Sequence, residues 1–223
     1  MSKNLLLHDM PEIILASTSP QRAQILEELG ISFSVVQIDA DEIVGSTPEE
    51  TVLTNAKLKI AAALGSGALS EGKIVMAADT VLAMDGKIFG KPDNPEAAKN
   101  YLAAFSGRQI CAFTVVAAIR KGDNKGAIAI DKALIRFLPL SGEMIDWYVS
   151  TGEPLNRAGA FGISRIGEIF VDTLAGSYSC VAGLSKKAVL AVIAEISGND
   201  NFKKNLLQLH NILNLDSFSL PLQ

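Results

Sequence analysis

Short apolar runs alternate with segments of helical periodicity along the first half of the chain. Runs with the length of strands occupy 12–16, 33–36 and 75–81. The segments between and after them repeat apolar side chains every three or four residues. Their boundaries carry helix signals, such as Pro20 after Ser19 at a start and Gly30 at an end. This pattern predicts helices over 20–29, 48–64 and 95–105.

The second half of the chain predicts an antiparallel hairpin. Two long strand-like runs, 110–119 and 127–137, flank the turn-rich segment 121–126. A tight turn is also predicted at Asp85-Gly86. Further predicted elements are a helix that begins after Ser141, a strand over 169–171, and helices over 185–196 and 202–213. Parallel units combined with a hairpin predict an α/β fold, with a mixed twisted sheet flanked by helices.

The composition fits one large domain or two closely packed lobes. Of the 223 residues, 48% are hydrophobic and 20% are charged, and the mean hydropathy is +0.28. No apolar stretch reaches the roughly 18 residues of a membrane-spanning helix, and the apolar part of residues 1–9 is too short for a signal peptide. The net charge of −4 and the pI of about 5.3 argue against broad nucleic-acid binding. We expect a cytoplasmic protein that binds neither membranes nor nucleic acid.

The scarcity of histidine narrows the possible chemistry. His8 and His210 both lie in terminal segments, so a Ser-His-Asp triad, a Cys-His dyad or a His-rich zinc site is not expected. Cys111 and Cys180 are isolated thiols without the spacing of metal ligands, which is typical of core residues. Catalysis would rest on carboxylates, lysines, arginines and hydroxyls, with an oxygen-ligated magnesium or manganese ion.

Asp79 is the strongest candidate for a functional residue. It follows the apolar run Val75-Met76-Ala77-Ala78, which predicts that it lies at the carboxyl end of a buried strand, where open α/β sheets bind ligands. Packing explains such an acid poorly, because carboxylates are seldom fully buried unless they are paired or bind a metal. Lys91, in the turn Gly90-Lys91-Pro92, offers a nearby cation. An acid and a cation on adjoining loops indicate metal-assisted phosphate chemistry.

The corner at 16–22 is a candidate phosphate site. It combines small hydroxyl residues, a helix N-terminus and Arg22, and free amides at a helix N-terminus attract anions. The alternative is an ordinary capped helix with a solvated arginine. The common nucleotide and nucleophile signatures, namely the P-loop, the Rossmann fingerprint and the G-x-S-x-G elbow, are absent from the sequence.

Four other charged residues could have either a functional role or an ordinary position on the surface. Asp39, Asp41 and Glu42 follow the second predicted strand directly, so they form either a hydrophilic loop or a place where at least one acid binds a metal. Lys57 lies within a predicted helix beside apolar positions. It is either a surface lysine or a group that faces a phosphate.

Several motifs, taken together, resemble the Maf family of nucleoside triphosphate pyrophosphatases. The similarity covers roughly 13–190, and the order and spacing of the motifs make it specific. The matching segments are Leu15-Ala16-Ser17-Thr18-Ser19-Pro20-Gln21-Arg22, Ala78-Asp79-Thr80-Val81, Gly90-Lys91-Pro92, Ser106-Gly107-Arg108, Glu153-Pro154-Leu155, Ala158-Gly159-Ala160-Phe161-Gly162-Ile163, Gly176-Ser177-Tyr178 and Val181-Ala182-Gly183-Leu184.

This resemblance implies a fold like that of the inosine triphosphate pyrophosphatases, with two lobes around a nucleotide cleft. It implies hydrolysis between the α and β phosphates, which requires a divalent cation and releases a monophosphate and pyrophosphate. Asp79 matches the family's proton acceptor, and Glu42 matches an acid near the metal. The residues that match phosphate-binding positions are Ser17, Ser19, Arg22, Lys57 and Lys91.

The chain departs from the family at positions that govern substrate choice. Gln21 replaces the first arginine of Ser-Pro-Arg-Arg, and Ser164-Arg165 replaces the frequent Gln-Gly. Thr80 resembles the subgroup that prefers dTTP and UTP, whereas Gln21 and Ser164 match neither that subgroup nor the one that prefers 7-methyl-GTP. Ile110 stands where histidine is common after Ser-Gly-Arg. We expect Gln21, Thr80 and Ser164 to determine specificity, and Arg165 to replace part of the charge lost at Gln21.

Our sequence-based interpretation is a cytoplasmic, metal-dependent nucleoside triphosphate pyrophosphatase. It has an N-terminal extension over 1–11, one two-lobed catalytic domain over 12–197 and a helical extension over 198–223. The resemblance also implies a homodimer. Two alternatives remain, a catalytically weak nucleotide-sensing or division-linked binding protein and a phosphatase that removes the terminal phosphate.

Overall fold

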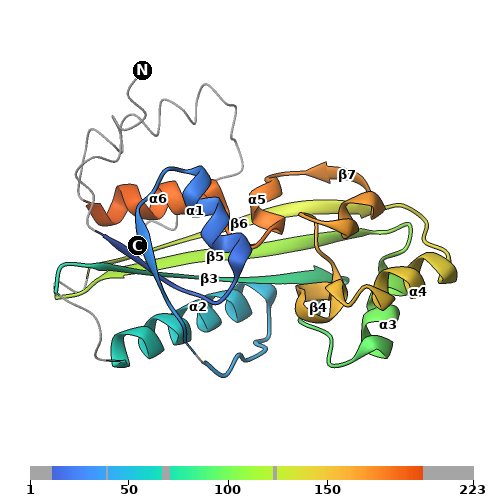
Figure 1. Cartoon of the computed structure of the whole chain (residues 1–223), viewed down its shortest axis with the longest axis horizontal. Coiled ribbons are helices and arrows are strands. Elements are labelled where there is room, and N and C mark those ends of the chain that lie inside the picture. The colour runs from blue at the N-terminus through green and yellow to red at the C-terminus, as the bar shows by residue number, and fades with distance from the viewer. Residues whose placement is uncertain (1–11, 39, 67–70, 123–124, 198–223) are drawn as a thin grey trace, which may run out of the picture.

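The computed structural model describes residues 12–38, 40–66, 71–122 and 125–197, and its centre is one mixed β-sheet (Figure 1). The sheet has seven strands in the order β2-β1-β3-β5-β6-β7, with β4 paired to β3. The strands are β1 (Ile13–Ala16), β2 (Phe33–Val36), β3 (Ile74–Met84), β4 (Lys87–Phe89), β5 (Gln109–Arg120), β6 (Gly126–Phe137) and β7 (Val171–Ala175). β1 is parallel to β2 and β3, and the other pairs are antiparallel. The predicted mixed sheet is confirmed.

Helices cover both faces of this sheet. They are α1 (Pro20–Glu28), α2 (Pro48–Gly65), α3 (Pro95–Phe105), α4 (Gly142–Ser150), α5 (Tyr178–Val181) and α6 (Lys186–Ser197), with the 3-10 helices η1 (Glu153–Asn156), η2 (Ala158–Ala160) and η3 (Ile166–Phe170). α6 and α2 lie on opposite faces (Figure 1). Ile74 and Met76 of β3 share a core with α6, whereas Val75 and Ala77 share one with α2. Burial on both faces explains why the first half of β3, over 74–78, is a continuous apolar run.

The strands β3, β5 and β6 are long enough to support a second core beyond the first. This core joins their other halves to α3 and α4. Its rings pack edge to face or tilted, with Phe105 at 4.8 Å from Phe89 and 5.5 Å from Phe137 between centroids. The α3–α4 core thus forms one lobe of the sheet, and the cores beneath α6 and α2 form the other.

The predicted hairpin pairing and the predicted Asp85-Gly86 turn are both confirmed. β5 pairs with β6 from Gln109↔Arg136 to Ile119↔Gly126. Asp85 and Gly86 have φ angles of 52° and 76°, and they close the two-residue turn between β3 and β4. Left-handed conformation at both central residues is the geometry of a type I′ turn, for which Asp-Gly is a preferred sequence.

The prediction of a strand over 169–171 was wrong in its position. Residues 166–170 form η3, and β7 begins only at Val171. Gly167, within η3, is closely packed: a side chain there would lie 2.7 Å from the carbonyl oxygen of Gly162. The predicted helix 202–213 and both histidines lie outside the described residues. In the part of the chain that the structure describes, no helix has both the length and the apolar character needed to cross a membrane.

The position of Asp79 also corrects a prediction. It lies in the middle of β3, not at its carboxyl end, because β3 stays paired with β5 through Asp79↔Val115 and on to Ala83↔Cys111. The parallel partner β1 ends much earlier, and its last pair with β3 is Leu15↔Met76. Asp79 therefore lies just beyond the end of β1, where β3 passes from one lobe to the other.

Candidate active site

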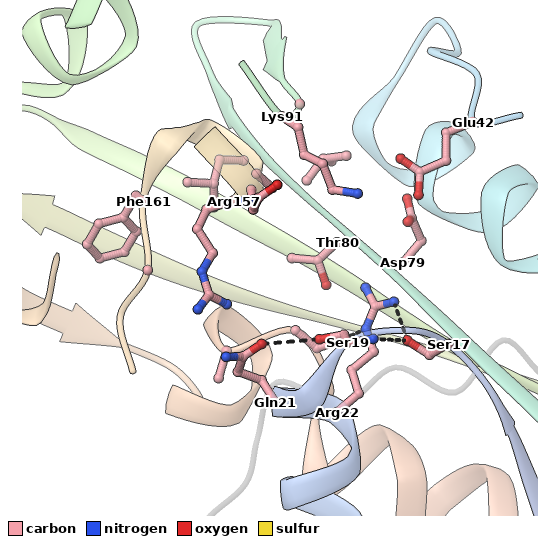
Figure 2. A pocket seen from close by; sticks show the side chains of 18 of the residues that line it. Ser17, Ser19, Gln21, Arg22, Glu42, Asp79, Thr80, Lys91, Arg157 and Phe161 are labelled. Atoms are coloured by element: carbon pink, nitrogen blue, oxygen red, sulfur yellow. Dashed lines mark hydrogen bonds between the residues drawn. The ribbon is translucent and has the colours of Figure 1, made fainter. Parts of the chain in front are cut away.

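A cavity of about 1210 Å³ lies where the two lobes meet (Figure 2). Its walls come from the corner between β1 and α1, α2 and the loop before it, the middle of β3, the Lys91 loop, the segment from η1 to η3 and the turn after α5. Acidic and basic side chains both line it. The acids are Asp41, Glu42, Asp79, Asp93 and Glu153, and the cations are Arg22, Lys59, Lys91, Arg157 and Arg165. Such a lining suits a ligand that carries both negative charge and a cation.

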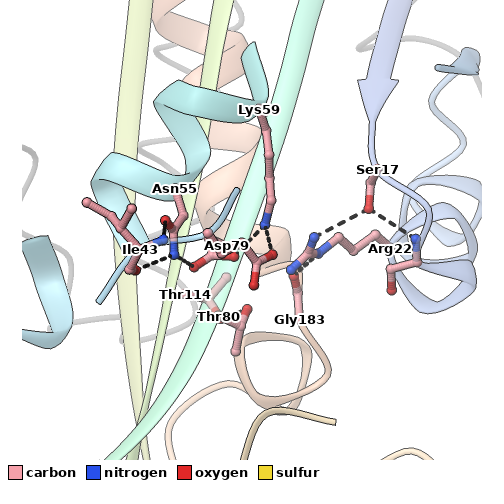
Figure 3. A network of polar contacts seen from close by, with 11 residues as sticks. Ser17, Arg22, Ile43, Asn55, Lys59, Asp79, Thr80, Thr114 and Gly183 are labelled. Carbon is pink, nitrogen blue, oxygen red and sulfur yellow. Dashed lines mark hydrogen bonds and ion pairs between the residues drawn. The ribbon is translucent and has the colours of Figure 1, made fainter. Parts of the chain in front are cut away.

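Asp79 is held by two side chains of α2 (Figure 3). Lys59 Nζ lies 2.6 Å from Asp79 Oδ1 and 2.8 Å from Glu42 Oε1. Asn55 Nδ2 donates to the second carboxylate oxygen of Asp79 at 3.2 Å. Asp79 is only 4% exposed. Its pairing with Lys59 and Asn55 lowers the free-energy cost of burying this acidic side chain. The carboxylate is thus fixed in position before any ligand binds.

Glu42 is ionised more readily than an ordinary glutamate. Partial burial on its own would raise its pKa, but the hydrogen bond and charge of Lys59 oppose that effect, and Lys91 and Arg22 add to the opposition. The net result is a pKa below the usual value for Glu42. Glu42 therefore stays negative beside Asp79 at neutral pH.

Asn55 also fixes the loop that carries Glu42. Its side chain accepts from Ile43 N at 2.9 Å and donates to Ile43 O at 3.1 Å. The helix that presents Asn55 begins at Pro48 because Thr47 caps it, accepting from Glu50 N at 3.1 Å. The cap, the helix and Asn55 together set the distance between the Glu42 loop and β3.

The structure corrects the predicted lysine. Lys57 is exposed and does not line the cavity, whereas Lys59 is buried and reaches Asp79 and Glu42. The reason is helical geometry: Val52, Ala56, Lys59 and Ala63 recur at intervals of four, three and four residues, which defines the buried stripe of α2. Lys57 lies off that stripe. The spacing was readable from the sequence and would have selected Lys59.

The corner between β1 and α1 arranges Arg22 through hydroxyl and carbonyl oxygens. Ser17 Oγ accepts from Ser19 N at 3.1 Å and from Arg22 Nη1 at 3.3 Å, and Arg22 Nε donates to Gly183 O at 2.9 Å. Ser19 stands at the N-terminus of α1 as its helix-start signal predicts, but contrary to expectation its side chain makes no capping bond and donates to Gln21 Oε1 at 3.4 Å. Burial lowers the pKa of Arg22, and the charges of Asp79 and Glu42 oppose the shift.

Thr80 points away from Asp79, toward the opposite face of β3, as alternation along a strand requires. Its Oγ lies 2.7 Å from Thr114 Oγ of β5. Thr114 in turn donates to Cys180 O at 2.7 Å. The strand thus presents an acid to the α2 side of the cavity and a hydroxyl to the α5 side.

The opposite wall carries Lys91 and Arg157 on connected loops. Gly159 N donates to Gly90 O at 2.8 Å, which ties the Lys91 loop to η2. Gly159 has a φ of 64°, and a side chain there would overlap Leu82, so only glycine fits without strain. The side chain of Arg157 points into the cavity (Figure 2).

Most of the predicted site residues line this one cavity. They are Ser17, Ser19, Gln21, Arg22, Glu42, Asp79, Thr80, Lys91, Ser164 and Arg165, and their individual roles stay predictions. Asp39 lies outside the described residues. The sequence analysis missed Asn55, Lys59, Thr114 and Arg157. Of these, Lys59 alone had a usable signal in its helical spacing.

The carboxylates of Asp79 and Glu42 suit a hard divalent cation. Both approach the same ammonium group, so their oxygen atoms face one region of the cavity wall. Magnesium and manganese prefer oxygen ligands, and Mg²⁺ is commonly held by one or two carboxylates together with substrate phosphates. The described ranges contain no group of three or more His, Cys, Asp or Glu residues that could hold a metal on its own. The donor set therefore fits a cation shared with a phosphate ligand.

Comparison with known proteins shows the family. Residues 12–196 match the family described as Maf-like protein, and this chain belongs to it. A dTTP/UTP pyrophosphatase of Symbiobacterium thermophilum is 37% identical over 177 residues, which cover 78% of this chain and 89% of the relative. A dTTP/UTP pyrophosphatase of Pseudoalteromonas atlantica is 38% identical over 175 residues, covering 77% and 90%.

Two solved structures resemble the chain at low identity. The Ham1 protein of Staphylococcus aureus has a TM-score of 0.44 and 19% identity, with 91% of this chain and 99% of that chain covered. A nucleoside-triphosphatase, or dITP/XTP pyrophosphatase, of Mycobacterium abscessus has a TM-score of 0.42 and 13% identity, covering 91% and 98%.

Proposed function

We propose that this chain hydrolyses nucleoside triphosphates to monophosphates and pyrophosphate, with pyrimidine nucleotides such as dTTP and UTP as substrates. The observation that carries the proposal is the placement of Asp79 and Glu42, both held on Lys59, in a cavity also lined by four other cations. The dTTP/UTP pyrophosphatases at 37–38% identity support the reaction and the substrate class.

In this mechanism Asp79 orients the attacking water and accepts its proton. The water oxygen forms a bond to the α-phosphorus, the bond from that phosphorus to the bridging oxygen breaks, and pyrophosphate leaves. A carboxylate suits this task because Asn55 and Lys59 fix both of its oxygens, so little reorganisation is needed when the substrate arrives.

The cations of the cavity offset the charge that develops on the leaving pyrophosphate. Arg22 is partly buried and held by Ser17 and Gly183, so its orientation is set in advance. Lys91 faces the same cavity from the other lobe, on the loop tied to Gly159. Such preorganised donors can each contribute about 2.7–4 kcal/mol of transition-state stabilisation.

A divalent cation held by Asp79 and Glu42 would add positive charge beside the phosphate oxygens. Lys59 then holds the two carboxyl groups close together and helps to keep Glu42 ionised. The proposal also includes a homodimer and a cytoplasmic location, which rest on the family resemblance and the composition.

The test is product analysis with a substrate panel. Purified protein would be incubated with Mg²⁺ or Mn²⁺ and canonical or modified triphosphates, 7-methyl-GTP included, and pyrophosphate and orthophosphate would be measured separately. We expect pyrophosphate with an equal amount of monophosphate, greatest with UTP and dTTP, and none in excess EDTA. Orthophosphate as the main product would indicate a terminal phosphatase, and tight binding without turnover would indicate a sensing protein.

A further inference from the structure

Thr114 is a fully buried residue that lies directly behind the wall of the cavity. It is 0% exposed and does not line the cavity, whereas its cross-strand partner Thr80 does. Its Oγ lies 2.7 Å from Thr80 Oγ, and the two side chains are neighbours in Figure 3. It also lies 2.7 Å from Cys180 O. A group of this kind can affect a ligand through its contact with Thr80.

The direction of the two hydrogen bonds follows from counting protons. A hydroxyl has one proton, and a carbonyl oxygen only accepts. Thr114 must give its proton to Cys180 O, because two unprotonated oxygens at 2.7 Å would repel each other. Thr114 then has only lone pairs for Thr80, so Thr80 must donate to it. Because its one proton is donated to Thr114, the Thr80 hydroxyl can only accept hydrogen bonds from a group in the cavity.

The pair of hydrogen bonds from Thr80 to Thr114 and from Thr114 to Cys180 O forms a relay, and its acceptor, the carbonyl oxygen of Cys180, is held in a fixed position. Cys180 belongs to α5, which is capped by Ser177. Gly183 N also donates to Cys180 O at 3.2 Å, and Gly183 O is the group that holds Arg22. A side chain added to Gly183 would come within 4.0 Å of Thr80 Oγ and 3.8 Å of Arg22 Nε. The turn after α5 thus sets the polarity of Thr80 and the position of Arg22 together.

We infer that Thr114 is a specificity-determining positioning residue, which makes Thr80 a pure hydrogen-bond acceptor toward the substrate. The nucleoside group that meets Thr80 is therefore a donor. Building on the proposed function, we assign it to the imide N3–H of uracil or thymine. Cytosine carries a lone pair at N3, and two facing acceptors are unfavourable, so this contact selects UTP over CTP.

The test compares Thr114→Val with Thr114→Ser. Valine keeps the shape but removes the hydroxyl, so the Thr80 proton becomes free to turn toward the cavity, whereas serine keeps the relay. We expect Thr114→Val to reduce the UTP-to-CTP ratio of kcat/KM for pyrophosphate release by about tenfold, and Thr114→Ser to stay within about twofold of the wild type. A merely structural loss would lower both rates and leave their ratio unchanged, which would overturn the inference.

Two further measurements separate the possible outcomes. The UTP-to-dUTP ratio should be the same in all three proteins, and a change confined to it would assign the donor to the ribose hydroxyl and overturn the base assignment. Equilibrium affinities for UTP and CTP in EDTA give the same comparison without turnover. If no pyrophosphate forms at all, the proposed function fails, while the affinity ratio of Thr114→Val against wild type still decides the role of Thr114. Thr80→Val, which removes the acceptor itself, is expected to lose the same preference.

Discussion

Lys59 Nζ lies 2.6 Å from Asp79 Oδ1, and this contact joins the middle of α2 to the middle of β3. The same ammonium lies 2.8 Å from Glu42 Oε1, so one buried cation is shared by two acids from different segments. A buried charge is tolerated only when it is paired, and removal of one partner leaves the other uncompensated. Lys59 is therefore central both to the fold of the cavity and to its electrostatics.

Replacement of Lys59 should impair activity much more than replacement of Lys57. Lys59→Met removes the cation between two carboxylates, and we expect kcat/KM for pyrophosphate release to fall by at least about a hundredfold, or about 2.7 kcal/mol. The free energy of unfolding should drop by about 1–3 kcal/mol, because Asp79 loses a buried partner.

Lys57→Met is the matched control on the same helix. Its side chain is exposed, so the free energy of unfolding should change by no more than about 0.5 kcal/mol and the activity should be retained. Steady-state kinetics and urea unfolding of both variants provide the measurements. Equal losses in the two variants would contradict the assignment of Lys59.

The pKa of Glu42 should rise when Lys59 is removed. Burial favours a raised pKa for this carboxyl, and the hydrogen bond and charge of Lys59 are the leading opposing causes. In the wild type the pKa is depressed, so ionised Glu42 stabilises the fold above the unfolded pKa, and this contribution is lost as the pH falls through the folded pKa. Carboxyl NMR titration should show the Glu42 transition at higher pH in Lys59→Met than in the wild type. An unchanged transition would exclude Lys59 as the cause.

Gly159→Ala should weaken both stability and substrate binding. The φ of 64° and the overlap with Leu82 predict a loss of about 1–3 kcal/mol in the free energy of unfolding. Displacement of Gly159 N from Gly90 O would also move the Lys91 loop, so KM should rise. Gly86→Ala is a suitable control, since its φ is 76° and nothing lies within 4 Å of the added methyl. It should lose stability with no change in KM, and a KM effect in Gly86→Ala alone would contradict this account.

Cys180 should be unreactive in the folded protein. Burial raises the pKa of its thiol to about 12, so almost no thiolate is present at pH 8. Cys111 is only partly buried, although burial raises its pKa as well. A thiol reagent at pH 8 should label Cys111 slowly and Cys180 only after unfolding, as peptide mapping can establish. Rapid labelling of Cys180 in the native state would show that α5 opens.

The sequence predicted the long elements well because their signals are local. The apolar periodicity of α2 and the Asp-Gly turn between β3 and β4 each determine local geometry without help from distant residues. The short elements were missed for the opposite reason. α5 has four residues and depends on the Ser177 cap and on contacts with β5, which periodicity does not reveal.

The same distinction between local signals and long-range contacts explains which site residues could be predicted. Asp79 stood out because an acid within an apolar run is unusual, yet the run could not show that β3 continues past it. Asn55 and Thr114 are neutral polar residues, and their importance comes from partners 24 and 66 residues away. Such long-range hydrogen bonds leave no trace in local spacing. Lys57 was predicted from the family resemblance, whereas the buried stripe of α2 passes through Lys59.

Asp79→Asn tests the central claim most directly. Asparagine keeps the size of the side chain and its contact with Asn55 or Lys59 but cannot accept the proton of the attacking water. The measurement is the rate of pyrophosphate release from UTP in the presence of Mg²⁺, for wild type and variant proteins with matched thermal unfolding. We predict that the folded variant loses nearly all turnover. Turnover by Asp79→Asn at a rate close to the wild type would contradict the role of Asp79 and, with it, the proposed mechanism.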